Sequence, residues 1–421
     1  MTAVRRRTHL ICSGVAIAAA VTCAVTVGVP AVAWAGRASP PARRAQLAPR
    51  YRVVAKIRLD GLPLVIAEDP RTNTTYAAQQ GPGEQFSVAV INNQTDKEVR
   101  RLPVFAYTLA FDSRTDAFYV PTATGVVVIG GRARRVIARL PVVAQFITVD
   151  PRTGHVYLAV HNVTRSVILV LSDRTNKVVD RIRFPASATF GPMAASPARG
   201  VIYAEVGIPN KPGGIWVIGT HSGKVLARIG AGGGLAVDDR NNVLAVLGGS
   251  SLTLVDGRTH KVRHVVGLLQ GTPQANTDAV AVSPGTHTVF ASAECDPGGW
   301  VDVVSERTGR ILKTINGGLL RSLAVDRRRD VVFAVDYTGD DVLVIDARTN
   351  KVIAKLAVGV RPDAVAVDPV TGRAYVANFA YGTVSVLAPT GVSSLPAARS
   401  AAATDRAAVG WAANARRGVC G

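Results

Sequence analysis

The chain has 421 residues and a formal net charge of +20 at pH 7, from 49 Lys and Arg against 29 Asp and Glu. Hydrophobic residues make up 48% of it, which excludes an intrinsically disordered protein and is enough for a large core. Four cysteines exclude a disulfide scaffold and most zinc modules, and the absence of any 18-residue apolar run beyond residue 36 excludes a polytopic membrane protein.

Residues 1–35 have the pattern of an export signal. Three arginines at positions 5–7 precede a stretch without charge from Leu10 to Gly36, and Ala33-Trp34-Ala35 provides the small residues that signal peptidase accepts. Pro30 interrupts a spanning helix close to that site and favours cleavage, whereas the length of the apolar stretch leaves an uncleaved membrane anchor open. The segment predicts a secreted or extracytoplasmic protein of the cell envelope.

Two further segments lack strand patterns. Residues 36–50 are rich in Pro, Ala and Arg and are predicted to be a linker. Residues 390–421 are rich in Ala, Arg and Ser and are predicted to be a flexible tail. Cys295 and Cys420 are the two cysteines outside the signal, and whether they pair is left open by the sequence.

Residues 51–389 contain a repeat of about 42 residues. Each of eight units has a short apolar run that ends in Asp or Ser, then a turn such as D-P-R-T-G, then a second apolar run. Asp at the first turn position can accept backbone N–H bonds, and Pro at the second sets φ for a type I turn. The anchor residues are Asp69, Asp112, Asp150, Ser196, Asp238, Ser283, Asp326 and Asp368.

Each of the first seven units contains four strand-like runs and no unit has a helical period, which predicts an all-β protein of the β-propeller class. The last unit has only three runs. The run at residues 52–59 resembles the fourth run of the seventh unit and can complete the last blade, so that no sheet edge is left open at the closure. We therefore expect eight four-stranded blades closed by an N-terminal strand, with seven blades as the alternative.

The repeats resemble those of the YVTN-repeat, or YncE-like, β-propeller family. Tyr375-Val376-Ala377-Asn378 nearly spells the signature, and the segments that begin at Tyr119, Tyr157 and Tyr203 echo it. Residues 341–351 resemble a second motif of the family, which has the form NTVSVIDTATNKVV. The resemblance implies a propeller, and it implies a role among surface-layer and binding proteins, with occasional lactonase-like or lyase-like enzymes.

Strand order divides the loops between two rims. The top rim holds the connections from the second to the third strand of each unit and from one unit to the next, and on it acidic residues gather over units 6 to 8. With nearby Trp and Arg they form a candidate site for a polar ligand or for calcium through oxygen ligands. The alternative is a charged rim in which Arg321 pairs with Asp363 and Arg361 with Asp278. The candidate residues are Asp278, Glu294, Asp296, Trp300, Arg321, Asp336, Asp340, Asp341, Arg361 and Asp363.

The bottom rim, formed by the other turns, is rich in arginine. Attraction to an anionic envelope polymer or lipid follows from such a charge. No recognition motif argues for sequence-specific nucleic-acid binding. The candidate polyanion contacts are Arg132, Arg134, Arg135, Arg327, Arg328 and Arg329.

These features favour a monomeric binding scaffold at the cell envelope with no chemistry of its own, for an unknown protein or small-molecule ligand. Only His161 among the histidines falls on the top rim, and no nucleophile–base pair is evident, which disfavours a lactonase-like or lyase-like enzyme. An anchored protein that binds envelope polymer through charge is the third hypothesis.

Overall fold

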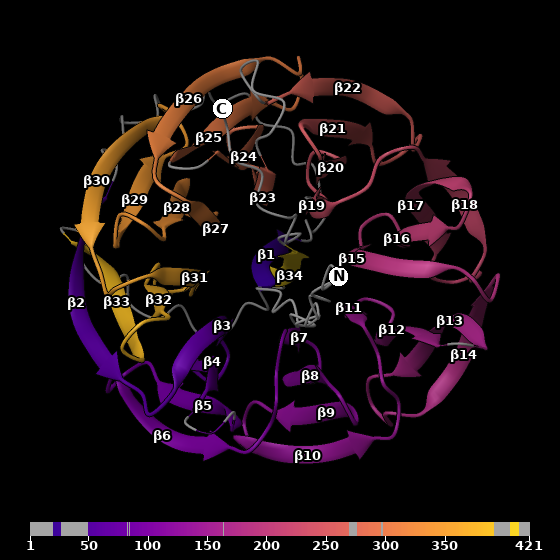
Figure 1. Ribbon diagram of the computed structural model, residues 1–421, viewed down its shortest axis with the longest axis horizontal. Coiled ribbons are helices and arrows are strands. Elements are labelled where there is room, and N and C mark those ends of the chain that lie inside the picture. Colours follow the sequence, from indigo (N-terminus) through magenta and orange to yellow (C-terminus); the bar gives the residue numbers. More distant parts are fainter. Residues whose placement is uncertain are drawn as a thin grey trace, which may run out of the picture.

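The computed structural model describes residues 20–26, 49–81, 83, 85–162, 164–268, 276–295, 298–390 and 405–411. This part of the chain contains no α-helix and forms eight four-stranded antiparallel sheets. The sheets are arranged radially as the blades of a propeller (Figure 1). The prediction of an all-β propeller with eight blades is confirmed, and the alternative of seven is excluded.

The strands of each blade are lettered A to D from the axis to the circumference. Blade 1 comprises β3 (Leu62–Asp69), β4 (Thr74–Gln80), β5 (Phe86–Asn92) and β6 (Lys97–Leu102). Blade 2 comprises β7 (Ala110–Asp112), β8 (Ala117–Thr122), β9 (Gly125–Gly130) and β10 (Arg135–Leu140). Blade 3 comprises β11 (Phe146–Asp150), β12 (His155–Asn162), β13 (Arg165–Ser172) and β14 (Val178–Phe184). Blade 4 comprises β15 (Thr189–Ser196), β16 (Val201–Ile208), β17 (Lys211–Gly219) and β18 (Val225–Ile229).

The other four blades continue round the ring. Blade 5 comprises β19 (Gly234–Asp238), β20 (Val243–Gly248), β21 (Ser251–Asp256) and β22 (Val262–Gly267). Blade 6 comprises β23 (Asn276–Ser283), β24 (Thr288–Cys295), β25 (Gly298–Ser305) and β26 (Ile311–Gly317). Blade 7 comprises β27 (Leu320–Asp326), β28 (Val331–Asp336), β29 (Asp341–Asp346) and β30 (Lys351–Ala357). Blade 8 comprises β31 (Pro362–Val367), β32 (Ala374–Asn378), β33 (Thr383–Thr390) and, as its D strand, β2 (Arg50–Arg58).

The ring is closed by β2, as the sequence predicts. This strand pairs antiparallel with β33, with Arg50 opposite Thr390 and Arg58 opposite Thr383. Its Tyr51 is buried, packs edge to face on Phe333 of blade 7 with ring centroids 5.0 Å apart, and donates its hydroxyl to Asp326 at 3.4 Å. The closing strand therefore joins blade 8 to blade 7 as well as completing its own sheet.

Burial explains why apolar and polar residues alternate weakly in the inner strands and strongly in the outer strands. Every residue of β28 and β29 is buried, because each face of an inner strand packs on a neighbouring blade. The D strand β30 of the same blade is mostly exposed, with Lys between aliphatic residues. Apolar burial between blades is the main term that holds the ring together.

Two tyrosines of the B strands join one blade to the next. Tyr76 and Tyr119 are fully buried in their B strands. Tyr76 donates its hydroxyl to the carbonyl of Gly131 in blade 2 at 3.1 Å, and Tyr119 donates to the side chain of Asn176 in blade 3 at 2.9 Å. A large ring with a polar tip fills the seam and also pairs a buried polar group.

Two short strands lie at the centre of the ring in Figure 1. They are β1 (Ala20–Thr26) and β34 (Asp405–Trp411), which pair antiparallel with Ala20 opposite Trp411. Their residues belong to the segments for which the sequence predicts an export signal and a flexible tail. The assignments of residues 1–35, 36–50 and 390–421 remain predictions, since most of these residues lie outside the described ranges.

Candidate functional site: the top rim over blades 7 and 8

The A–B and C–D turns form the bottom rim, and the B–C and D–A connections form the top rim. At the top of blade 7, Arg321 at the start of β27 lies with its guanidinium 3.9 Å from the centroid of the Tyr337 ring. Arg361, from the D–A connection into blade 8, lies 6.0 Å from the same ring. Two cations thus flank one aromatic ring, an arrangement that the ring quadrupole stabilises.

Asp363 lies close to this pair of arginines. Its side chain is 8% exposed, and its carboxylate lies 3.5 Å from the guanidinium of Arg321. Burial raises the pKa of Asp363, and Arg321 opposes that shift. The predicted pairing of Arg321 with Asp363 is confirmed. The predicted pairing of Arg361 with Asp278 involves a side chain outside the described residues.

The remaining acids of blade 7 bond to the protein itself. Asp336 accepts the backbone N–H groups of Gly318 at 2.7 Å and Gly339 at 2.8 Å, which fixes the D–A and B–C connections. Asp340 accepts the backbone N–H of Arg361 at 2.8 Å. Asp341 pairs with Lys355 at 3.0 Å. Burial raises the pKa of Asp341, with Lys355 opposing the shift and the neighbouring acids adding to it.

Two bulky residues of blade 8 adopt left-handed backbone conformations at this site. Arg361 has φ of 52° and Tyr381, in the B–C turn, has φ of 70°. The turns that carry them are joined by the N–H of Phe379, which donates to the carbonyl of Arg361 at 2.9 Å. Such conformations cost about 1–3 kcal/mol and concentrate at functional sites. Tyr381 is also 78% exposed.

The candidates on blade 6 are only partly brought to this site. Trp300 donates its indole N–H to the carbonyl of Leu268 and to Asp302, each at 3.2 Å, so it packs within its own blade and the preceding connection. Glu294 has one buried carboxylate oxygen without a hydrogen-bond partner among the described residues. Asp278 lies in β23 and its side chain is not described, and Asp296 lies outside the described residues, as do the side chains of Cys295 and Cys420.

Within the described ranges, no three His, Cys, Asp or Glu side chains gather so as to hold a metal ion. The oxygens of Asp336 and Asp340 accept backbone N–H groups, and Asp341 and Asp363 each have a cationic partner. Calcium binding stays a prediction, and the contacts of these four acids favour the charged-rim alternative for them.

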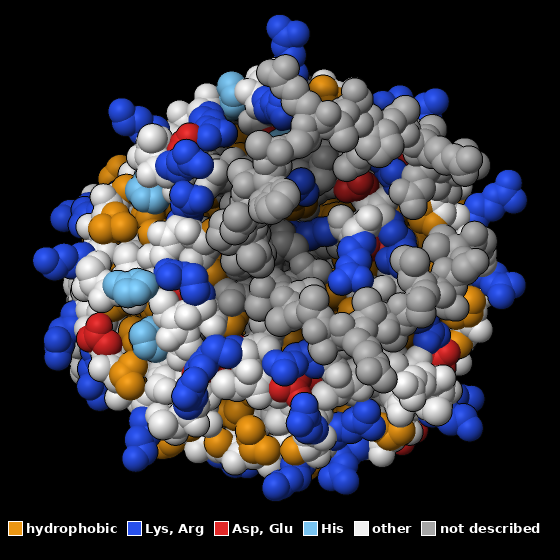
Figure 2. All heavy atoms as spheres, turned by 180° about the vertical axis from the view of Figure 1, so that it is seen from behind, with side chains coloured by type: hydrophobic (Ala, Val, Ile, Leu, Met, Phe, Trp, Pro, Cys, Tyr) orange, Lys and Arg blue, Asp and Glu red, His pale blue; other side chains and the backbone are white. Residues whose placement is uncertain are grey.

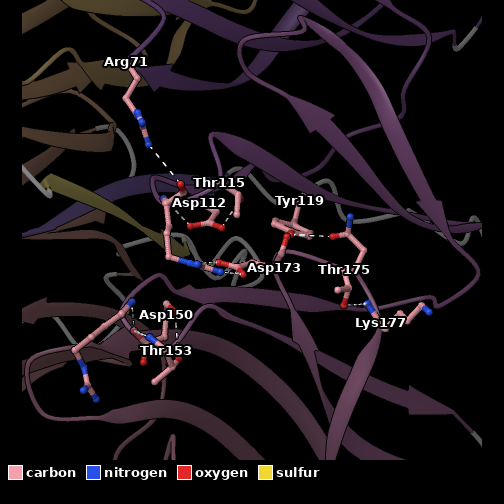
Figure 3. A network of polar contacts seen from close by, with 12 residues as sticks. Arg71, Asp112, Thr115, Tyr119, Asp150, Thr153, Asp173, Thr175 and Lys177 are labelled. Carbon is pink, nitrogen blue, oxygen red and sulfur yellow. Dashed lines mark hydrogen bonds and ion pairs between the residues drawn. The ribbon is translucent and has the colours of Figure 1, made fainter. Parts of the chain in front are cut away.

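Several bottom-rim arginines join neighbouring blades. Arg114 pairs with the buried Asp173 of blade 3, with Nε 2.6 Å from its carboxylate, and Arg71 donates to the carbonyl of Ser113 in blade 2 at 2.6 Å (Figure 3). Arg373 pairs with Asp96 across the seam between blades 8 and 1 at 2.6 Å. The turn aspartates act as predicted, since Asp150 accepts the N–H of Arg152 at 2.9 Å.

The arginines predicted to contact a polyanion fall into two groups, those that bond to the protein itself and those that are exposed. Arg134 donates to the hydroxyl of Thr74 in blade 1 at 3.0 Å, and Arg329 pairs with the fully buried Asp326 at 2.9 Å. Arg132, Arg135 and Arg328 are exposed, while Arg327 is half-buried. Half of the predicted set is therefore directed outward, and the arginines that bridge elements were not recognised from the sequence.

A histidine–serine pair occurs on the top rim of blade 3. His161 Nδ1 lies 2.9 Å from the hydroxyl of Ser166. Ser166 is 2% exposed, and its hydroxyl also lies 2.9 Å from the carbonyl of Ala186 and 2.5 Å from that of Ala188, so it donates to the backbone. A nucleophile needs an accessible hydroxyl whose proton passes to a base, and this geometry provides neither.

Glu205 is a top-rim acid that the sequence analysis missed. It lies in β16 close to Gly191 and Gly232, where a Cβ atom at either glycine would overlap its carboxylate. Burial raises the pKa of Glu205, and the N–H of Gly233 opposes that shift. No ion pair to Glu205 occurs in the described part of the chain. The glycine-rich stretch at residues 230–234 was the only signal in the sequence.

No protein family model matches the chain, and no curated protein matches it by sequence. Solved structures do match its fold. BamB from Moraxella catarrhalis is 15% identical with a TM-score of 0.59, over 80% of this chain and 100% of that one. A europium-containing methanol dehydrogenase is 11% identical with a TM-score of 0.58, over 80% and 93%. Kuenenia stuttgartiensis hydrazine synthase is 14% identical with a TM-score of 0.50, over 85% and 100%. These identities show the propeller fold and nothing finer.

The described residues contain no helix that is long and apolar enough to span a membrane.

Proposed function

We propose that the chain is a YVTN-type propeller, exported to the cell envelope, that binds a ligand on its top rim over blades 7 and 8 and performs no chemistry. The observation that carries this proposal is the pair of left-handed residues Arg361 and Tyr381 on adjoining turns beside Tyr337. Strain of this kind is retained where a side chain must be held in one direction.

The chemistry of the site favours a ligand with a carboxylate group. Arg361 is exposed and forms no ion pair in the described ranges, so its guanidinium is available to an anion. The exposed Tyr381 offers an aromatic face on which a sugar ring or a peptide can pack. Arg321 is already paired with Asp363 and positions Tyr337.

A binding screen tests this function. The protein is titrated calorimetrically with sugar acids, dicarboxylates and short peptides that have free C-termini. We expect one of these classes to bind and to raise the melting temperature. Arg361→Gln should weaken that binding about tenfold or more, because a charge-assisted hydrogen bond is lost. Arg310→Gln, at an exposed bottom-rim site, is the matched control.

Two results would refute the proposal: no binding by any of the three classes, or binding that Arg361→Gln leaves unchanged. Turnover of lactones or esters by the purified protein would instead support the enzyme hypothesis. Cell fractionation with an antibody against the propeller tests the envelope location.

A further inference from the structure

The positive charge of the chain is concentrated on the outer wall of the ring. The wall is formed by the eight D strands, which together carry 16 Lys and Arg and only two Asp and Glu. Figure 2 shows Lys and Arg side chains projecting outward around the circumference. The wall is thus a stronger candidate for an anion-binding surface than the bottom rim, where several arginines join the blades.

The charge is uneven around the wall. The four consecutive strands β30, β2, β6 and β10, here named the basic arc, carry eleven Lys and Arg and one acid, Glu98. All eleven basic residues are exposed. The other four D strands carry five basic residues and one acid, so the same fold provides a weakly charged half for comparison.

Few of the charges in the basic arc are used within the protein. Arg101 pairs with Glu98 and Asp60, Lys355 pairs with Asp341, and Lys56 donates to the carbonyl of Val358. The side chains of the other eight have no ion pair or hydrogen bond in the described part of the chain. Eight unpaired cations on adjoining strands repel one another unless anions lie between them.

Protection of the sheet edges accounts for only part of this pattern. Charged side chains on an edge strand discourage pairing with another sheet, and either sign serves that purpose. A ratio of eleven bases to one acid exceeds what protection requires. The side chains between the basic residues are largely aliphatic, with Val99 48% and Ile137 47% exposed.

We propose that the basic arc binds a linear polymer that carries a negative charge on each repeating unit. The arc follows the convex circumference over four blades (Figure 1), so a flexible chain can contact all of it, whereas a flat lipid surface can contact only part. This surface is separate from the top rim over blades 7 and 8, and either assignment can fail while the other holds.

The test compares two fourfold variants of the full chain in which the net charge is lowered equally. The arc variant carries Arg52→Gln, Arg58→Gln, Arg100→Gln and Arg139→Gln. The control variant carries Arg132→Gln, Arg174→Gln, Arg258→Gln and Arg328→Gln in exposed bottom-rim turns. None of the eight side chains forms an ion pair in the described ranges, so both proteins should melt with the parent.

The probes are inorganic polyphosphate and poly-glutamate, whose separate affinities distinguish a phosphate polymer from a carboxylate polymer. We expect binding by the parent that weakens steeply with salt, because counterions are released. The arc variant should bind at least tenfold more weakly at about 0.1 M salt, and its slope of log affinity against log salt should be less steep by about 3. The control variant should stay within about twofold of the parent.

Equal weakening of both variants would overturn the proposal, because the effect would then come from net charge alone. Absence of binding to both polymers at about 50 mM salt would also overturn it. Tighter binding to vesicles of anionic lipid than to either polymer would assign the arc to a membrane surface instead.

Discussion

At the bottom rim, Arg114, Arg134 and Arg373 each reach across a seam to a partner on the neighbouring blade. At the top rim over blades 7 and 8, Arg361 is exposed and has no ion pair within the described ranges, although its backbone is held in a left-handed conformation. The first arrangement stabilises the ring. The second costs stability and leaves a cation available.

The residues with positive φ show a similar contrast between the two rims. In the bottom-rim turns they are mostly Asn, Asp, His and Gly, such as Asn73 and Asn350, which tolerate positive φ at low cost. On top of blade 8 the residues other than glycine are Arg361 and Tyr381, for which the conformation is expensive. Arg134, with φ of 50°, is the bulky exception among the bottom-rim turns, and its side chain bonds to Thr74 of blade 1. Arg361 and Tyr381 form no side-chain hydrogen bond or ion pair within the described ranges, which indicates that these two residues are retained for what their side chains present.

The largest expected effect comes from removing the closing strand. A protein that starts at Gly61 lacks β2 and with it the buried Tyr51, Ile57 and Leu59. Each buried apolar side chain contributes about 1.5–3 kcal/mol, and the deletion also exposes the edge of β33. We expect aggregation or loss of the cooperative unfolding transition, measured by circular dichroism and size-exclusion chromatography.

The matched control starts at Pro49 and keeps the whole of β2. Because β2 and its pairing with β33 are intact in this protein, its propeller should melt at the same temperature as that of the full chain. A protein starting at Gly61 that folds and melts normally would show that closure does not depend on this strand.

The next effect is expected at the seam between blades 2 and 3. Arg114→Ala leaves the fully buried carboxylate of Asp173 without its cation. Removing one partner of a fully buried pair costs about 3–5 kcal/mol, and since Arg114 is 30% exposed we expect about 2 kcal/mol. Denaturant unfolding measures it. Arg132→Ala, at an exposed turn, should change the free energy of unfolding by less than about 0.5 kcal/mol, and equal losses would contradict the contrast between bridging and free arginines.

The sequence predicted the fold well because each repeat carries its own strand and turn signals. Turn aspartates such as Asp150 and the closing run at residues 52–59 act locally or by simple pairing, and both were found. The pair Arg321–Asp363 was also predicted, because both residues start neighbouring A strands.

Sequence reasoning failed for the contacts that cross a seam between bottom-rim turns. Arg114 and Asp173 are 59 residues apart, and nothing near either residue distinguishes Arg114 from the exposed Arg132. Buried acids were missed for the same reason, since the burial of Glu205 and Glu306 depends on blades that meet only after folding.

The third prediction concerns such an acid at the seam of blades 5 and 6. Burial and the nearby Asp238 raise the pKa of Glu306 to about 9, while Asn241 donates to it at 3.2 Å and His287 lies 3.8 Å away. A carboxyl whose pKa is higher in the folded than in the unfolded state binds a proton more tightly when folded. Its contribution to stability is therefore lost as pH rises from about 4.5 to about 9.

Glu306→Gln keeps the shape and removes this titration. We expect the variant to lose less stability than the parent between about pH 6 and pH 9, and to be more stable at about pH 9 by about 1–3 kcal/mol, as is typical of a buried group without a full set of partners. Denaturant unfolding at both pH values checks it. Asp180→Asn, at an exposed site, is the matched control for the loss of one carboxylate. A Glu306→Gln protein whose free energy of unfolding falls as much as that of the parent between about pH 6 and pH 9 would contradict the assignment.

The smallest effect separates the two rims most directly. Tyr381→Asn replaces a bulky residue at φ of 70° by one that tolerates the left-handed region, and because Tyr381 is 78% exposed little packing is lost. We expect the free energy of unfolding to rise by about 1 kcal/mol. At the bottom rim, Asn350→Ala removes a residue suited to its φ of 56° and should lower the free energy of unfolding by a similar amount.

The same Tyr381→Asn protein should bind the top-rim ligand more weakly, because an aromatic contact is gone. A variant that is destabilised would show that Tyr381 packs rather than stores strain, and a variant that is stabilised with unchanged ligand affinity would remove Tyr381 from the binding site.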